Sequence, residues 1–183
     1  MQKHGWGQFA FNIVGLALLG AVVEERMRRT VMLLTFLAAG VGSAVLLGVT
    51  RPELVDAGTS DSVAGFVGLL TIYWLRRDSS GSPPVEAFAY SAFFAVYLAV
   101  IDLLPLAFAI GVALAFTGVL TSVRLTRSAR VAAVSLAVVV AVATGVLCVE
   151  RDGHGFGLAI GLAIGLVLNW HRGTDAARRA SPG

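Results

Sequence analysis

Seven long apolar segments take up most of this chain. They lie near residues 7–24, 30–49, 58–75, 85–102, 104–123, 131–148 and 155–170. At about 1.5 Å per helical residue, each is roughly long enough to cross the ~30 Å hydrocarbon core of a bilayer. Only 14% of the 183 residues are charged, whereas a soluble domain has about a quarter. The sequence therefore predicts an all-α fold, a polytopic membrane helical bundle of about seven transmembrane helices. We expect one transmembrane domain, residues 1–171, and a polar cytoplasmic tail, residues 172–183.

The fourth and fifth segments are separated only by residues 102–105, Asp-Leu-Leu-Pro. A single helix over residues 85–123 would be about 58 Å long, which is too long for one crossing. We therefore predict a tight helical hairpin at this point.

The basic residues are distributed unequally between alternate connections, and this indicates an orientation. Eleven of the fourteen fall on one side: Arg26, Arg28, Arg29, Arg76, Arg77, Arg124, Arg127, Arg130, Arg172, Arg178 and Arg179. The other side has only Lys3, Arg51 and Arg151. The positive-inside rule then predicts a multi-pass protein of the cell membrane with an outer N-terminus and a cytoplasmic C-terminus. Because the arginines sit in short clusters between apolar runs, we interpret them as topology determinants and expect no nucleic-acid partner.

A few polar residues are predicted at the outer ends of three of these helices. Gln8 and Asn12 are four residues apart, so they share one helix face. Ser60 lies at the start of the third segment, and His154 at the start of the last. A histidine within reach can take the proton of a serine hydroxyl and so activate it as a nucleophile. Asn and Gln side chains can stabilise the negative charge that develops on a carbonyl oxygen.

These polar positions occur in three motifs that together resemble the rhomboid family of intramembrane serine proteases. Residues 7–12, Gly-Gln-Phe-Ala-Phe-Asn, with Glu24 twelve residues after Asn12, are similar to the family's second helix, His-x-x-x-Asn with a later Glu. Residues 58–60, Gly-Thr-Ser, resemble the Gly-x-Ser-Gly of the nucleophile helix. The pattern His154-x-x-Gly157-x-x-x-Gly161 resembles the helix with the catalytic histidine. The resemblance covers residues 4–49, 58–76 and 152–168.

The resemblance implies a rhomboid-like core and a Ser–His dyad that needs no metal or cofactor. Ser60 would be the nucleophile and His154 the general base and then acid, while Asn12 and Gln8 would donate to the oxyanion. The partners would be the lipid bilayer and transmembrane protein substrates, cut near the outer end of a transmembrane helix.

The sequence differs from the family pattern at several points. Gln8 stands where the family usually has histidine, Asp61 replaces the glycine after the nucleophile, and Ala64 replaces an aromatic residue that supports the histidine in many members. Three predicted helices lie between the helix of Ser60 and the helix of His154, whereas the family core has one helix there. We expect the two additional helices to pack at the periphery of the bundle.

These differences leave other functions open. A catalytically inactive rhomboid-like protein that binds or guides other membrane proteins is the main alternative. A small-solute transporter or channel is a third, although the middle thirds of the helices offer almost no charge for a polar pathway.

Overall fold

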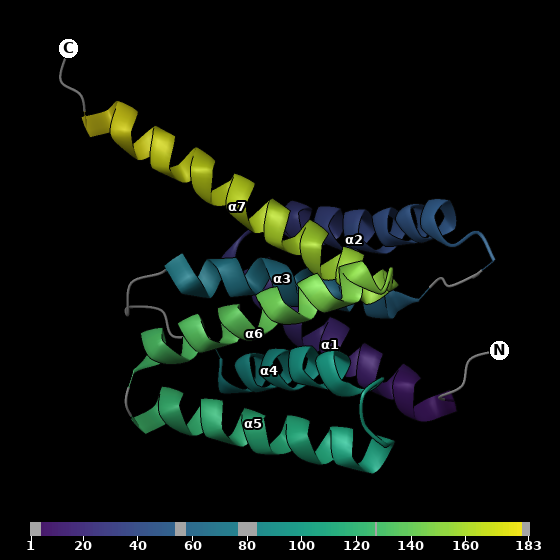
Figure 1. The fold of residues 1–183 in the computed structure, drawn as a ribbon. Helices are drawn as coiled ribbons and strands as arrows, with labels where there is room; N and C mark the ends of the chain where they lie inside the picture. The colour runs from purple at the N-terminus through teal and green to yellow at the C-terminus, as the bar shows by residue number, and fades with distance from the viewer. Residues whose placement is uncertain (1–4, 54–57, 77–83, 127, 181–183) are drawn as a thin grey trace.

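The computed structural model describes residues 5–53, 58–76, 84–126 and 128–180, with the backbone alone for residues 169–180. Within these residues the chain forms seven helices and no strand (Figure 1). They are α1 (Gly5–Arg26), α2 (Arg29–Thr50), α3 (Thr59–Arg76), α4 (Val85–Val100), α5 (Leu106–Thr126), α6 (Ala129–Val149) and α7 (Gly153–Ala180). The predicted all-α bundle of seven helices is confirmed.

The helix bounds follow the predicted segments closely, with one clear difference. The predicted hairpin is present, because α4 ends at Val100 and α5 begins at Leu106. The last helix, in contrast, continues to Ala180, beyond the predicted end of the apolar segment near residue 170. By length and composition α1, α2, α5 and α6 can each cross a membrane, and residues 85–100 and 153–168 form shorter apolar helices.

The helix α3 lies at the centre of the bundle and packs against α1, α2, α4, α6 and α7. Every residue from Ser60 to Trp74 is buried. Because the neighbouring helices shield α3 from lipid, it does not need an apolar outer face. This explains why α3 can contain Ser60, Asp61, Ser62 and Thr71, all of them buried.

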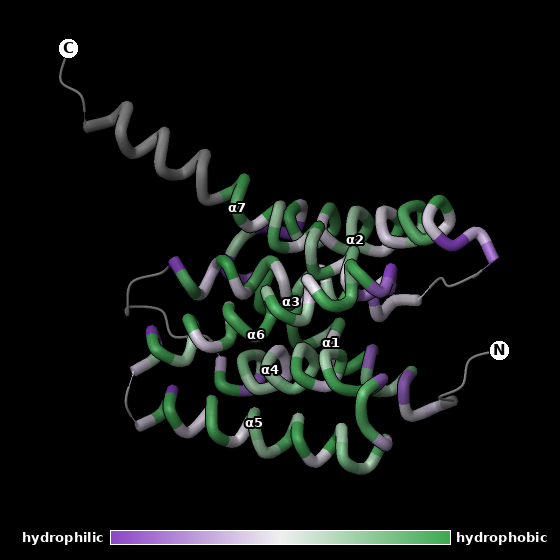
Figure 2. Tube along the Cα trace, in the orientation of Figure 1, coloured by the Kyte–Doolittle hydropathy of each residue, from purple (hydrophilic) through white to green (hydrophobic). Residues whose placement is uncertain are grey.

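The surrounding helices present their apolar side chains outwards, and Figure 2 shows hydrophobic residues along most of their length. Large exposed apolar side chains on α2, α5 and α6 include Leu34, Val41, Val45, Phe108, Leu114, Val119, Val138 and Val142. An apolar outer surface of this extent is the surface of a protein in a bilayer. The chain is therefore a multi-pass membrane protein.

The closest packing in the bundle is between α3 and α7, and glycines make it possible. A Cβ atom on Gly161 would collide with the backbone of Gly65, and one on Gly68 would collide with the carbonyl oxygen of Leu158. A Cβ atom on Gly157 would meet the carbonyl oxygen of Asp61. Small residues at such spacings let two backbones approach in lipid, where the hydrophobic effect does not drive helices together.

Two further contacts fix α3 and α4 against their neighbours. The Ser62 hydroxyl donates to the Phe36 carbonyl oxygen on α2 at 2.9 Å. The Tyr90 hydroxyl on α4 donates to the Phe11 carbonyl oxygen on α1 at 3.1 Å, and the two rings stack with centroids 4.8 Å apart.

The expectation that two extra helices pack peripherally is right for α5 and wrong for α4. Among the described residues, α5 packs mainly against α4 and α6. The helix α4 instead contributes buried residues to the common core, including Phe88, Phe94 and Leu98. A run of small residues on one face of α4, Ala87, Ser91 and Ala95, is fully buried and permits this close packing.

The helices alternate in direction, so the start of α1, the end of α2, the start of α3 and the connections α4–α5 and α6–α7 lie at one end of the bundle (Figure 1). The described arginines Arg26, Arg28, Arg29, Arg76, Arg124 and Arg130 lie at the other end. Lys3, Arg77 and Arg127 fall outside the described residues, as do the side chains of Arg172, Arg178 and Arg179.

We predict that Gly161→Ala destabilises the protein by about 1 to 3 kcal/mol, because the added methyl group must push α3 away from α7. The free energy of unfolding in detergent or bicelles measures the effect. Gly118→Ala on α5 is the matched control, since a Cβ atom there meets nothing within 4 Å. Equal stability of the two variants would show that the close contact does not hold the helices together.

Candidate active site

A cavity of about 480 Å³ opens at the end of the bundle where α1 begins. Its polar lining comes from four separate parts of the chain: Gln8, Asn12, Ser60, Asp102, Asp152 and His154. Its apolar walls come mainly from α4 and α5, and include Phe93, Phe94, Tyr97 and Leu98. All four residues singled out from the sequence, Gln8, Asn12, Ser60 and His154, therefore line one cavity.

Ser60 reaches this cavity because α3 begins just before it, at Thr59. The side chain is nearly buried, with 7% of the residue exposed. The first backbone N–H groups of a helix have no partner within the helix, and they create a partial positive charge. The Ser60 hydroxyl thus lies beside a set of backbone donors that favours negative charge.

The α1 side of the cavity supplies two amide side chains. Asn12 is buried and Gln8 is half-buried one turn closer to the end of the bundle. Within the described part of the chain, no hydrogen bond involves the Asn12 side chain, so its amide is available to a group inside the cavity.

His154 is positioned by the turn between α6 and α7. The Arg151 N–H donates to the Cys148 carbonyl at 3.2 Å, and the Asp152 N–H donates to the Leu147 carbonyl at 2.9 Å. Arg151 has a φ of 57°, a left-handed conformation. This is the Schellman arrangement that ends a helix, with an arginine where glycine is usual. It ends α6 and leaves only three residues between α6 and α7.

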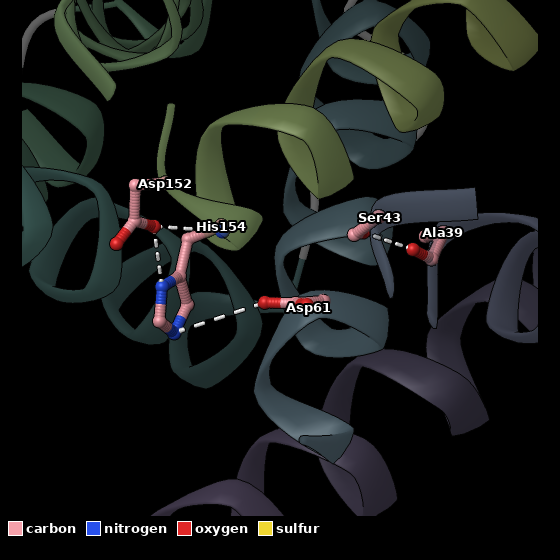
Figure 3. Close-up of polar contacts among 5 residues, drawn as sticks. All are labelled: Ala39, Ser43, Asp61, Asp152 and His154. Atoms are coloured by element: carbon pink, nitrogen blue, oxygen red, sulfur yellow. Dashed lines mark hydrogen bonds and ion pairs between the residues drawn. The ribbon is translucent and has the colours of Figure 1, made fainter. Parts of the chain in front are cut away.

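Asp152 then forms the N-cap of α7 and also contacts the imidazole of His154. Its Oδ1 accepts the His154 backbone N–H at 2.8 Å and lies 2.7 Å from the imidazole Nδ1 (Figure 3). Asp and Asn are favoured N-cap residues because their side chains satisfy N–H groups at the helix start. The same carboxylate therefore fixes the start of α7 and the orientation of the imidazole.

Asp61 lies on the other side of the imidazole. Its Oδ1 is 4.0 Å from His154 Nε2, and the side chain is almost completely buried (Figure 3). The carboxylate occupies the space next to Gly153, where a Cβ atom would come within 2.8 Å of Oδ2. Asp61 is not among the residues that line the cavity.

The Ser60 hydroxyl and the His154 imidazole line the same cavity, yet in the described residues no hydrogen bond joins them. The nitrogen that could accept the serine proton, Nε2, is the one that faces α3. Catalytic hydrogen bonds are often long or poorly aligned before substrate binds.

An aromatic ring does lie beside the histidine, although it comes from an unexpected helix. The ring centroid of Phe94 on α4 is 6.3 Å from that of His154. Ala64, the position where a supporting aromatic residue would be expected, is fully buried in the core. The aromatic side chain beside His154 therefore comes from α4 and not from α3.

Sequence reasoning missed Asp152, Phe94 and Asp102 as residues of this site. The sequence did indicate a capping role for Asp152, because an Asp directly before the first residue of a helix is a typical N-cap. No sequence signal marked Phe94 or Asp102, because their positions depend on how deeply α4 packs into the bundle.

The pKa of Asp152 lies below its ordinary value of 3.8. Burial alone would raise it, but the hydrogen bond and charge of His154 and the backbone N–H groups of His154 and Gly155 together lower it. Asp152 is therefore a carboxylate across the whole neutral range.

This shift predicts how stability depends on pH. A carboxyl with a lowered native pKa adds stability above its unfolded pKa, and that stability is lost as the pH falls through the native value. We expect wild type to be more stable than Asp152→Asn near pH 5, and the difference to shrink as the pH falls below about 4, where the carboxylate is protonated. Unfolding free energies of both proteins between about pH 5 and pH 2 measure it, and a difference that grows as the pH falls below about 4 would contradict the assignment.

Comparison with known proteins agrees with the motifs. A family model for the Rhomboid domain matches residues 3–125, which include Gln8, Asn12 and Ser60 and end before the helix with His154. Neither the curated proteins nor the solved structures contain a significant match. The match spans more than half of the chain, and the chain is thus a member of the rhomboid family.

Proposed function

We propose that this protein is an intramembrane serine protease that cleaves membrane-anchored proteins near the outer end of a transmembrane helix. Ser60 would be the nucleophile and His154 the general base and acid. Asn12 and Gln8 would donate hydrogen bonds to the oxyanion.

One observation carries the proposal: a single cavity at the end of the bundle is lined by Ser60, His154, Asn12 and Gln8. A hydroxyl, an imidazole and amide donors are the groups that acyl transfer requires. The four residues come from three different helices: Gln8 and Asn12 from α1, Ser60 from α3 and His154 from α7. The location at a bundle end also suits hydrolysis, which consumes water.

In the proposed reaction, Ser60 Oγ attacks the carbonyl carbon of the substrate while its proton passes to His154 Nε2. The negative charge on the carbonyl oxygen would face the Asn12 and Gln8 amides and the backbone N–H groups at the start of α3. His154 then gives its proton to the leaving amine nitrogen. A water molecule, deprotonated by the same imidazole, releases the acyl group from Ser60.

The orientation belongs to the proposal as well. The arginine-rich end of the bundle would face the cytoplasm of the cell and the cavity would face outwards. The transmembrane domain would cover residues 1–171, and residues 172–183 would be a cytoplasmic tail. Substrates would reach the cavity from the bilayer, where their outer helix ends lie at the same depth.

We predict that Ser60→Ala and His154→Ala each reduce cleavage of a fluorogenic transmembrane substrate in proteoliposomes by at least about 100-fold. The control is Thr59→Ala, because Thr59 is the neighbouring hydroxyl and lines a groove between α2 and α3 instead of the cavity. Unchanged cleavage in either Ala variant, with normal folding, would rule out the dyad.

A second candidate function is a non-catalytic rhomboid that binds or guides membrane proteins. The observation in its favour is Asp61, whose carboxylate faces the Nε2 atom that would have to accept the serine proton. A negative charge there stabilises the protonated imidazole, which cannot act as a base.

Reaction with a fluorophosphonate probe separates the two candidates. For the protease we expect labelling of wild type and Thr59→Ala at Ser60, and loss of labelling in Ser60→Ala and His154→Ala. Wild-type protein that is folded but never labelled, and that cleaves no substrate, would favour the binding function.

A further inference from the structure

Asp152 makes two hydrogen bonds to His154, one to its backbone and one to its imidazole ring. The first caps α7, and the second orients the ring. Its Oδ1 holds both the backbone N–H of His154, at 2.8 Å, and the imidazole Nδ1, at 2.7 Å. The cap is itself held by the end of α6, through the Asp152 N–H and the Leu147 carbonyl. The imidazole orientation therefore depends on the backbone of the α6–α7 turn.

The contact with Asp152 also determines which nitrogen carries the imidazole proton. A carboxylate can only accept a hydrogen bond, so Nδ1 must be the protonated nitrogen of the neutral ring. Nε2 is then left with its lone pair. That atom faces α3, the helix of Ser60, with Asp61 Oδ1 at 4.0 Å.

The other titratable groups around this imidazole come from three elements. Asp61 lies on α3, Asp102 follows α4 and Tyr97 lies on α4; the latter two line the same cavity. Among the described residues that line the cavity there is no lysine or arginine. The charged residues in the described lining of the cavity are thus carboxylates, and Asp152 is hydrogen-bonded to the ring at Nδ1.

We propose that Asp152 is a positioning residue for the reaction, which fixes the tautomer and the orientation of His154 so that Nε2 can accept the Ser60 proton. This inference rests on the proposed protease function. It extends the Ser60–His154 pair by a third residue that does not touch the substrate.

Acylation of Ser60 would move protons and electrons between the serine, the imidazole and the substrate. As Ser60 Oγ bonds to the carbonyl carbon, the Oγ proton moves to Nε2 and the C=O π electrons move to oxygen. The Nδ1 proton stays on Nδ1, and the resulting imidazolium is stabilised by the Asp152 carboxylate. When the C–N bond breaks, the Nε2 proton leaves with the amine nitrogen, and the neutral ring returns to its first tautomer.

The simpler role for Asp152 is that of a cap only, and two substitutions separate the roles. Asp152→Ser keeps an N-cap oxygen but is too short to reach Nδ1 as well. Asp152→Asn keeps both the cap and an acceptor oxygen but removes the charge. Glu150→Gln is the matched control, because it removes an exposed carboxylate from the same turn.

We expect Asp152→Ser to lower kcat by about 10- to 100-fold with little change in KM, because proton transfer and not substrate binding is impaired. Asp152→Asn should lower kcat less, and should shift the acid limb of the kcat/KM profile to lower pH, since the imidazolium loses a stabilising charge. Glu150→Gln should change neither quantity. Wild-type kcat and pH profile in both Asp152 variants would overturn the inference.

A measurement that needs no activity makes the test independent of the protease assay. The ¹⁵N chemical shifts of the imidazole report the tautomer, and the chain has three histidines, so His154→Gln identifies the signal. We expect the Nδ1–H tautomer in wild type, and a mixture or the Nε2–H tautomer in Asp152→Ser. An unchanged tautomer in Asp152→Ser would overturn the inference even if Ser60 proves catalytic. If the tautomer changes in Asp152→Ser but wild type neither cleaves substrate nor reacts with fluorophosphonate, the protease function is overturned, and with it the catalytic role of Asp152.

Discussion

The backbone-to-backbone contact between α3 and α7 is the interaction on which the candidate site depends. Gly68 on α3 and Gly157 and Gly161 on α7 lie so close to the facing backbone that there is no room for a Cβ atom. In a bilayer, apolar side chains gain little by leaving lipid for protein, so association relies on close van der Waals contact. The same contact brings the start of α3, with Ser60 and Asp61, beside the start of α7, with His154.

That proximity creates an electrostatic problem, which the turn before α7 helps to solve. Asp61 is almost completely buried, with its Oδ1 4.0 Å from His154 Nε2, and moving a carboxylate out of water is costly. A protonated histidine between Asp61 and Asp152 compensates both carboxylates by its charge, whereas the single N–H of the neutral ring serves Asp152. Asp61, which stands where the rhomboid pattern has glycine, is packed against Gly153. Its carboxylate therefore contacts the start of α7, and Asp61 is not among the residues that line the cavity.

Much of this architecture could be predicted from the sequence because membrane helices obey simple constraints. Apolar length gave the seven helices, and the Asp102–Pro105 break gave the hairpin. The odd number of helices between Ser60 and His154 required both to lie at the same end of the bundle. The depth of α4 could not be predicted, since hydropathy does not distinguish a helix that faces lipid from one inside the bundle. Phe94 and Asp102 were missed for that reason, and Asp152 because its contact with the ring depends on the turn geometry.

The helices on the two sides of the cavity differ in how completely other helices surround them. On one side, Ser60 and His154 belong to helices whose backbones touch, and α3 is surrounded by protein along its whole length. On the other side, α1 exposes Trp6, Phe9, Ile13 and Val14 outwards, and its amides reach the cavity from a helix in direct contact with lipid. Ser60 and His154 thus belong to two closely packed helices, while Asn12 and Gln8 belong to a helix with an open outer face. We expect the lipid composition of the bilayer to act on the positions of Asn12 and Gln8 more than on the distance between Ser60 and His154.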